Sequence, residues 1–206
     1  MRRSLYVILA GIICLFFANF ASADTVTVAA FADPSGNSFD PLFSVNWTEK
    51  TVEGGWADYR TGLNLIVKVT GSDVVFNNAW FAMSQLEVIE MTNLWGNIYG
   101  KTGAGTINFY QDNTSQNPVL TIAFDESFIS QQSVGSKDFF GQNVTITGSA
   151  VPFQLSMEEF SFSFVNVTNN PDGFTATASF NASAVPEPMT IALLGLGGIV
   201  LLRKRR

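Results

Sequence analysis

Apolar side chains recur at every second position in much of the chain between residues 24 and 180. The alternation is clearest in four segments, namely residues 63–70, 120–125, 160–165 and 174–180. Successive side chains of a strand point to opposite faces of a sheet, whereas the apolar face of a helix recurs every three to four residues. A period of two therefore predicts strands with one buried and one solvated face, and it constrains this part of the chain to an all-β fold.

Turn-forming residues separate the alternating segments. Residues 169–173 end in Pro-Asp-Gly, a strong turn signal, so we expect a hairpin between residues 160–168 and 174–180. Weaker alternation predicts further strands at residues 25–31, 43–48, 56–60, 73–76, 86–91, 106–111 and 144–147. About ten short strands separated by such turns predict one antiparallel β-sandwich of the jelly-roll or lectin-like type, spanning residues 24–180.

Two segments need separate interpretations. Trp80, Met83 and Leu86 would also share one face of a helix, so a short helix within residues 79–91 is the alternative to a strand there. Residues 181–184, which follow the last predicted strand, are small or polar and predict a short tether.

The composition excludes several kinds of chemistry. The chain contains no His and a single Cys, Cys14, which excludes a Ser-His-Asp triad, a Cys-His pair, a His-ligated metal and a disulfide framework. Residues 24–185 hold 16 acidic and 5 basic residues, a net charge of −11. Nucleic-acid phosphates are bound by clustered Lys and Arg, so this charge predicts no nucleic-acid partner.

Residues 1–23 have the order of a secretory signal peptide. Two Arg at positions 2 and 3 precede a mostly apolar run at residues 5–20. Ala21 and Ala23 then match the small-x-small pattern of a signal peptidase site, which predicts cleavage before Asp24. We expect the apolar run to enter the export machinery as a helix, and a retained signal anchor is the alternative.

The C-terminal end has three parts in sequence. A Pro-Glu-Pro motif is followed by an apolar run of 14 residues, 189–202, and then by a basic end. The motif is Pro186, Glu187 and Pro188, and the basic end is Arg203, Lys204, Arg205 and Arg206. A helix of this length reaches about 21 Å, short of a hydrocarbon core of about 30 Å. We therefore expect a short transmembrane helix in the inner membrane that acts as a stop signal or is read by a partner, rather than a permanent anchor, with the basic end in the cytoplasm.

This arrangement of residues 185–206 resembles the PEP-CTERM sorting signal, which has a Pro-Glu-Pro motif, a short Gly-containing apolar helix and an Arg-rich end. The resemblance implies a Gram-negative bacterium that makes exopolysaccharide, as in a biofilm. It also implies recognition by an exosortase, a membrane transpeptidase-like enzyme, with processing near residues 186–188. A plain membrane anchor with a chance Pro-Glu-Pro sequence is the alternative.

The central domain has no side-chain spacing that predicts a catalytic centre or a bound cofactor. Glu87 and Glu90 would point to opposite faces of a regular strand, whereas a glycosidase needs two facing carboxyl groups about 5–10 Å apart. Asp33, Asn37 and Asp40 carry oxygen ligands in a Gly-containing loop, which makes them the candidate for a Ca²⁺ site. An ordinary turn is the alternative for this loop.

Trp56 and Trp95 are the candidate glycan contacts. Trp56 follows Gly54 and Gly55, and Trp95 precedes Gly96, so each lies near a predicted loop where its ring would be accessible. The apolar face of a sugar can stack on such a flat ring, and packing of both rings in the core is the alternative.

The terminal signals, together with the absence of a catalytic constellation in the sequence, predict an exported, non-enzymatic protein of the cell surface or exopolysaccharide matrix. Signal peptidase and the export machinery would act on its N-terminus, and the precursor would stay tethered to the inner membrane until an exosortase processes it. The alternatives are a carbohydrate-binding, lectin-like module with exopolysaccharide as its partner, and a secreted glycan hydrolase or lyase.

Overall fold

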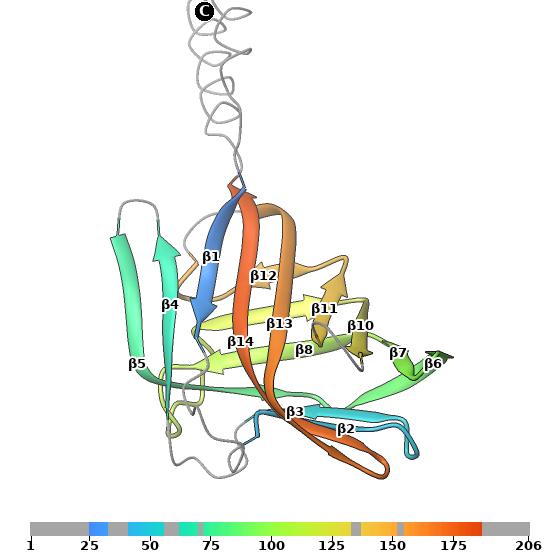
Figure 1. Ribbon diagram of the computed structural model, residues 1–206. Helices are drawn as coiled ribbons and strands as arrows, with labels where there is room; N and C mark the ends of the chain where they lie inside the picture. Colours follow the sequence, from blue (N-terminus) through green and yellow to red (C-terminus); the bar gives the residue numbers. More distant parts are fainter. Residues whose placement is uncertain are drawn as a thin grey trace, which may run out of the picture.

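The computed structural model describes residues 25–32, 41–55, 62–69, 72–132, 137–151 and 155–186 (Figure 1). These residues form fourteen strands and contain no helix, which confirms the all-β prediction for the central domain. The predicted signal-peptide helix, the predicted transmembrane helix and the strand expected at residues 56–60 lie outside the described residues.

Neighbouring strands are antiparallel throughout the described part of the chain. In chain order they are β1 (Val26–Phe31), β2 (Phe43–Asn46), β3 (Thr51–Gly54), β4 (Leu63–Val69), β5 (Ser72–Met83), β6 (Leu86–Leu94), β7 (Asn97–Thr102), β8 (Gly105–Tyr110), β9 (Leu120–Phe124), β10 (Glu126–Gln131), β11 (Asp138–Gln142), β12 (Thr145–Thr147), β13 (Leu155–Asn170) and β14 (Gly173–Pro186).

β14 pairs with three other strands, and these pairings close part of the sheet. β13 lies along its whole length, β1 lies against its second half, and β2 lies against residues 173–176. Eight strands thereby form a closed antiparallel barrel in the order β14, β13, β11, β10, β7, β6, β3 and β2. The remaining strands, β1, β4, β5, β8, β9 and β12, continue the same sheet from the other side of β14.

This second branch folds back over the first because β5 bends (Figure 1). Residues 72–79 of β5 pair with β4, whereas residues 80–83 pair with β8. The layer that begins with β8 consequently packs across β1, β13 and β14. The strands form one continuous sheet with a closed barrel, in place of the two separate sheets of the predicted sandwich.

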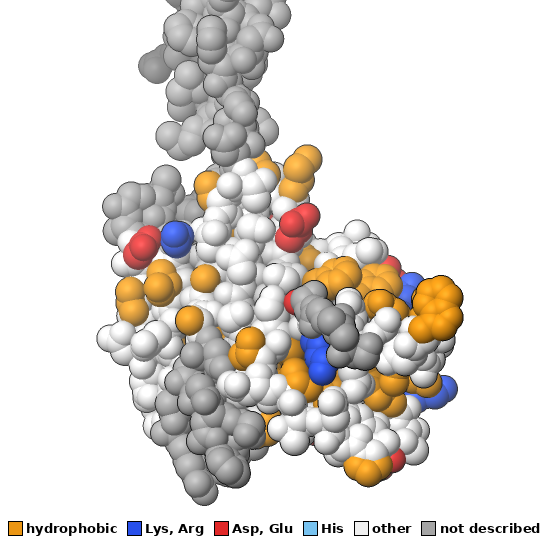
Figure 2. Space-filling view, viewed as in Figure 1, with side chains coloured by type: hydrophobic (Ala, Val, Ile, Leu, Met, Phe, Trp, Pro, Cys, Tyr) orange, Lys and Arg blue, Asp and Glu red, His pale blue; other side chains and the backbone are white. Residues whose placement is uncertain are grey.

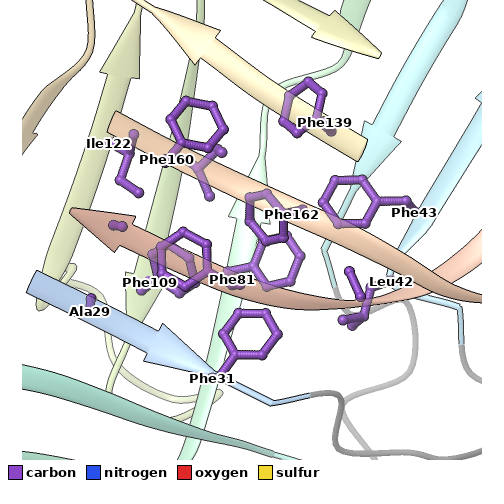
Figure 3. Packing of buried hydrophobic residues seen from close by; sticks show 14 of the residues in the cluster. Ala29, Phe31, Leu42, Phe43, Phe81, Phe109, Ile122, Phe139, Phe160 and Phe162 are labelled. Atoms are coloured by element: carbon purple, nitrogen blue, oxygen red, sulfur yellow. The ribbon is translucent and has the colours of Figure 1, made fainter. Parts of the chain in front are cut away.

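Phenylalanine rings fill the space between the two layers. Phe31 of β1, Phe81 of β5 and Phe162 of β13 point toward one another (Figure 3), with ring centroids 5.7–6.2 Å apart. Phe43 of β2 packs against Phe162 and also against Phe164, so it joins this core to the interior of the barrel. Aromatic rings bury large apolar areas, and this cluster is therefore a main source of the stability of the fold.

The predicted hairpin is confirmed and is longer than expected. β13 and β14 pair from the turn at residues 171–172 to Pro186. The prediction of a tether at residues 181–184 is wrong, because these residues pair with both β1 and β13 as part of β14. Ala182 and Ala184 are completely buried, so their small side chains allow close packing in the core. The folded domain therefore continues beyond residue 180.

Candidate functional site

The β6–β7 hairpin carries Trp95 at its tip. Trp95 and Gly96 are the central residues of the turn, and their φ angles are 52° and 86°. Two residues with positive φ make a type I′ turn, whose twist matches that of the strands it joins. The Gly96 amide donates a hydrogen bond of 3.1 Å to the Asn93 side-chain oxygen. The Trp95 side chain is 95% exposed, so its ring is accessible, as a glycan contact requires.

The left-handed backbone of Trp95 is unfavourable. The β-carbon crowds the following carbonyl in this conformation, which costs about 1–2 kcal/mol for a residue with an ordinary side chain. Gly and Asn adopt the conformation readily and are the usual residues of this turn. Strained residues concentrate at functional sites. The conformation of Trp95, together with its exposure, thus makes it a candidate functional side chain.

Further apolar side chains are exposed along the same hairpin. Ile89, Met91 and Leu94 of β6 and Tyr99 of β7 are each more than a third exposed. In the described part of the chain, β6 pairs with β3 only over its first two residues, and the Val88 amide donates a hydrogen bond to the Lys50 carbonyl, so the outer edge of β6 is open beyond Val88. Exposed apolar side chains and an open strand edge are both features of an interaction surface.

A second candidate site lies on the outer face of β11, β13 and β14. It is a groove of about 430 Å³. The side chains that line it on this face are Phe140, Gln142, Glu159, Ser161, Asn181 and Ser183. The strand register places Ser161 between Phe140 and Asn181, and it places Glu159 opposite Ser183. The groove thus combines one aromatic ring with amide, hydroxyl and carboxylate groups.

The aromatic wall of this groove is part of a stacked pair. Phe140 is 42% exposed, and its ring stacks on Phe128 of β10 with centroids 5.5 Å apart and an interplanar angle of 22°. Beyond Phe128 lies Lys101, whose Nζ is 6.0 Å from the centroid of that ring. Lys101 also forms an ion pair of 2.6 Å with Glu126. The hydrogen bond to Glu126 and the charges of Glu126 and Glu90 raise the pKa of Lys101.

Most of the other site residues predicted from the sequence lie outside the described residues. They are Ala21, Ala23, Asp24, Asp33, Asn37, Asp40, Trp56, Glu187, Pro188, Arg203, Lys204, Arg205 and Arg206. Pro186 is described, and it is the last residue of β14. Among the residues that the structure covers, no group of three or more Asp, Glu, Cys or His is placed to hold a metal ion.

The prediction that Glu87 and Glu90 point to opposite faces of their strand is wrong. The register of β6 on β7 shifts between Val88, which pairs with Thr102, and Glu90, which pairs with Lys101. Val88 and Thr102 are buried in the barrel, so their neighbours Glu87 and Lys101 point outward. The bulge brings Glu90 to the same outer face as Glu87 because it inserts one extra residue.

Phe128 and Phe140 were not predicted as site residues. A signal for Phe140 was present, because it directly follows Phe139. Adjacent residues of a strand face opposite sides, so only one of the two rings can enter the core. Phe139 is completely buried, and Phe140 therefore faces outward.

The last strand of the domain, β14, ends at Pro186, within the C-terminal segment that resembles a sorting signal. Residues 184–206 match the family model of the PEP-CTERM protein-sorting motif, and the chain is a PEP-CTERM protein. The motif implies export and processing by an exosortase at the membrane. No curated protein and no solved structure matches the chain. The described residues include no helix that is long and apolar enough to span a membrane.

Proposed function

We propose that this protein is a non-enzymatic component of the bacterial cell surface or of the exopolysaccharide matrix. The sorting motif supports export and exosortase-dependent processing. The observation that carries the proposal further is the β6–β7 hairpin, which displays the exposed ring of Trp95 on a strained turn. An exposed aromatic tip suits a protein that acts by adhesion, because large exposed apolar groups mark interaction sites.

The destination can be tested in a host that makes an exosortase, by comparison with a strain that lacks the exosortase gene. With the enzyme, we expect the intact mass to lack the C-terminal apolar segment and the protein to be recovered with the outer surface or the matrix. Without the enzyme, we expect the full C-terminal mass and recovery with the inner membrane. An identical C-terminal mass in both strains would contradict exosortase processing, and recovery of the processed protein away from the surface and matrix would contradict the proposed destination.

Carbohydrate binding through Trp95 is the second candidate function. The same observation favours it, because a ring that is 95% exposed can present its whole flat face to the apolar face of a sugar. A rigid aromatic side chain also loses little conformational entropy when it binds. Exopolysaccharide would then be the partner that retains the protein in the matrix.

Titration calorimetry with the host's own exopolysaccharide tests this function on the processed protein. We expect Trp95→Ala to weaken binding about tenfold, because it removes the stacking ring. Met157→Ala is the matched control, since Met157 is 81% exposed and lies on β13, away from the hairpin. Equal affinities of the wild type and Trp95→Ala for the exopolysaccharide would contradict glycan binding by Trp95. Release of reducing ends during the titration would instead identify a hydrolase or lyase.

A further inference from the structure

Side chains on the outer face of the barrel form a continuous row across six strands. Pairing places Asn181 opposite Ser161, Ser161 opposite Phe140, and Phe140 opposite Phe128. The row continues from Phe128 to Lys101, which pairs with Glu90. Strands lie about 4.8 Å apart, so the row extends about 24 Å from β14 to β6. A ligand that follows this row must be an extended chain rather than a compact molecule.

The groove of about 430 Å³ lies at the β14 end of this row, over β11, β13 and β14. Its polar side chains are those of Gln142, Glu159, Ser161, Asn181 and Ser183. Within the described part of the chain, none of them forms a hydrogen bond through its side chain. Their donors and acceptors are consequently available to a ligand.

The chemistry of the groove restricts the class of ligand. The amide and hydroxyl groups can each donate and accept hydrogen bonds, which matches the hydroxyl groups of a sugar. Phe140 offers a flat apolar face for stacking against a sugar ring. Glu159 lies in the groove, and the net charge of −11 over residues 24–185 repels polyanions. Lys101 is the cation of the row, and Glu126 neutralises it.

The surface around the groove has the same character. Figure 2 shows the outer face of β1, β13 and β14 mainly in white, the colour of the backbone and of side chains that are neither charged nor hydrophobic, with hydrophobic side chains gathered over the strands of the neighbouring barrel wall. An uncharged polar face beside exposed aromatic rings suits a ligand that has many hydroxyl groups and no charge.

We propose that this outer face binds an extended, neutral polysaccharide, with the groove on β11, β13 and β14 as its main subsite and Phe140 as the stacking ring. The proposal rests on the carbohydrate-binding function given above. It assigns binding to a surface separate from the Trp95 turn. Substitutions can therefore disrupt either surface and leave the other intact.

The experiment uses the processed protein and the neutral and acidic fractions of the host's own exopolysaccharide, separated by anion exchange. Ser161→Trp fills the groove from its centre, and Phe140→Ala removes the stacking ring. Ser163→Trp is the matched control, because Ser163 lies on the same strand and the same outer face but does not line the groove. Binding is measured by affinity electrophoresis, and thermal unfolding shows that each variant is folded.

We expect the neutral fraction to bind the wild type and Ser163→Trp equally. We expect Ser161→Trp and Phe140→Ala to bind at least about tenfold more weakly. Unchanged binding by both groove variants, with binding lost in Trp95→Ala, would overturn the groove and leave the carbohydrate-binding function intact. Stronger binding of the acidic fraction would overturn the ligand class. Binding of neither fraction to the wild type would overturn the groove and the carbohydrate-binding function together.

Discussion

At the scale of a single residue, Trp95 combines a backbone conformation that lowers folding stability with an almost fully exposed side chain. Its side chain is 95% exposed, so packing in the core gives no reason for a large ring at this position. Its φ of 52° favours Gly or Asn, and Gly96 already occupies the second central position of the turn. A bulky residue that is both strained and solvent-exposed is expected where function, and not stability, determines the side chain.

Trp95→Asn is predicted to stabilise the protein and to weaken glycan binding. Asn adopts the left-handed conformation with less strain, so we expect the free energy of unfolding to rise by about 1 kcal/mol. Trp95→Ala separates the two effects, because it removes the ring but keeps the crowded β-carbon. Chemical denaturation of the three proteins measures the difference. No gain in stability for Trp95→Asn over Trp95→Ala would show that the turn is not strained.

Asp112 makes the stability contributed by the loop between β8 and β9 depend on pH. Its Oδ1 accepts hydrogen bonds of 2.7–2.9 Å from the hydroxyl and amide groups of Thr114 and Ser115. These bonds, with those from Thr114 contributing most, lower the pKa of Asp112 below its ordinary value of 3.8. A carboxyl group whose pKa is lower in the folded state stabilises that state at pH values above the pKa of the unfolded state. This stabilisation is lost as the pH falls through the pKa of the folded state.

Asp112→Asn should therefore lose less stability than the wild type when the pH is lowered from neutral to below 3.8. The urea midpoint, measured across this range, gives the comparison. Asp73→Asn is the control, because it removes another exposed carboxyl group without touching the loop. Parallel curves for the wild type and Asp112→Asn would show that the loop hydrogen bonds do not depend on the carboxylate.

At the scale of elements, the sorting motif and the folded domain share residues. The motif begins at residue 184, whereas β14 ends at Pro186. The last pairs of β13 with this part of β14 involve Leu155 and Ser156, and a bulge separates them from the rest of the hairpin. The Ser156 hydroxyl also donates a hydrogen bond of 3.2 Å to the Val185 carbonyl oxygen. An enzyme that binds the chain next to residues 186–188 therefore meets residues that are paired within the sheet.

Ser156→Ala is predicted to speed processing by an exosortase. Loss of one hydrogen bond weakens pairing by about 0.5–1 kcal/mol, which raises the population of the unpaired strand end about twofold to fivefold. Pulse-chase labelling of the precursor in a host with the enzyme measures the rate. Ser163→Ala, at an outward position farther along β13, should leave the rate unchanged. Equal rates for Ser156→Ala and the wild type would mean that cleavage does not require unpairing.

The sequence predicted strands where buried apolar residues alternate over several positions, as in β4, β9, β14 and residues 160–164 of β13. It did not predict β3, β7, β10 and β11. β3 has only four residues, and β7 has a Gly at an inward position where a β-carbon would lie 2.8 Å from the Trp47 ring. The bend of β5 could not be predicted from the sequence either, because the side chains of a strand that changes partners still alternate between two faces.

The two candidate sites could be predicted from the sequence to different degrees, because one depends on neighbouring residues and the other on strand pairing. The exposure of Trp95 followed from its neighbour Gly96, since local turn chemistry is encoded in adjacent residues. The groove instead depends on the register of β11 against the β13–β14 hairpin, and β12 lies between these elements in the chain. Register between β11 and β13 is set by the whole sheet, so no local pattern could place Phe140 opposite Ser161.

At the scale of the whole molecule, β14 joins the barrel to the second branch. It pairs with β1, β2 and β13, and its inward side chains from Phe174 to Ala184 are buried. β1 begins the described domain and β14 ends it, and Val26 lies opposite Ala184 (Figure 1). These contacts join the two ends of the domain, so they can form only when the last strand is available.

We therefore predict that a mature chain shortened to end at Asp172 does not fold, whereas one that ends at Pro186 does. The shorter chain loses the burial of Phe174 and Phe180, worth about 1.5–3 kcal/mol each, and it opens the barrel. Small domains are stable by only about 5–15 kcal/mol, so this loss should exceed what the fold tolerates. We expect cooperative thermal unfolding and protease resistance only for the longer chain. Cooperative unfolding of the shorter chain would show that the other strands form a stable domain before β14 arrives.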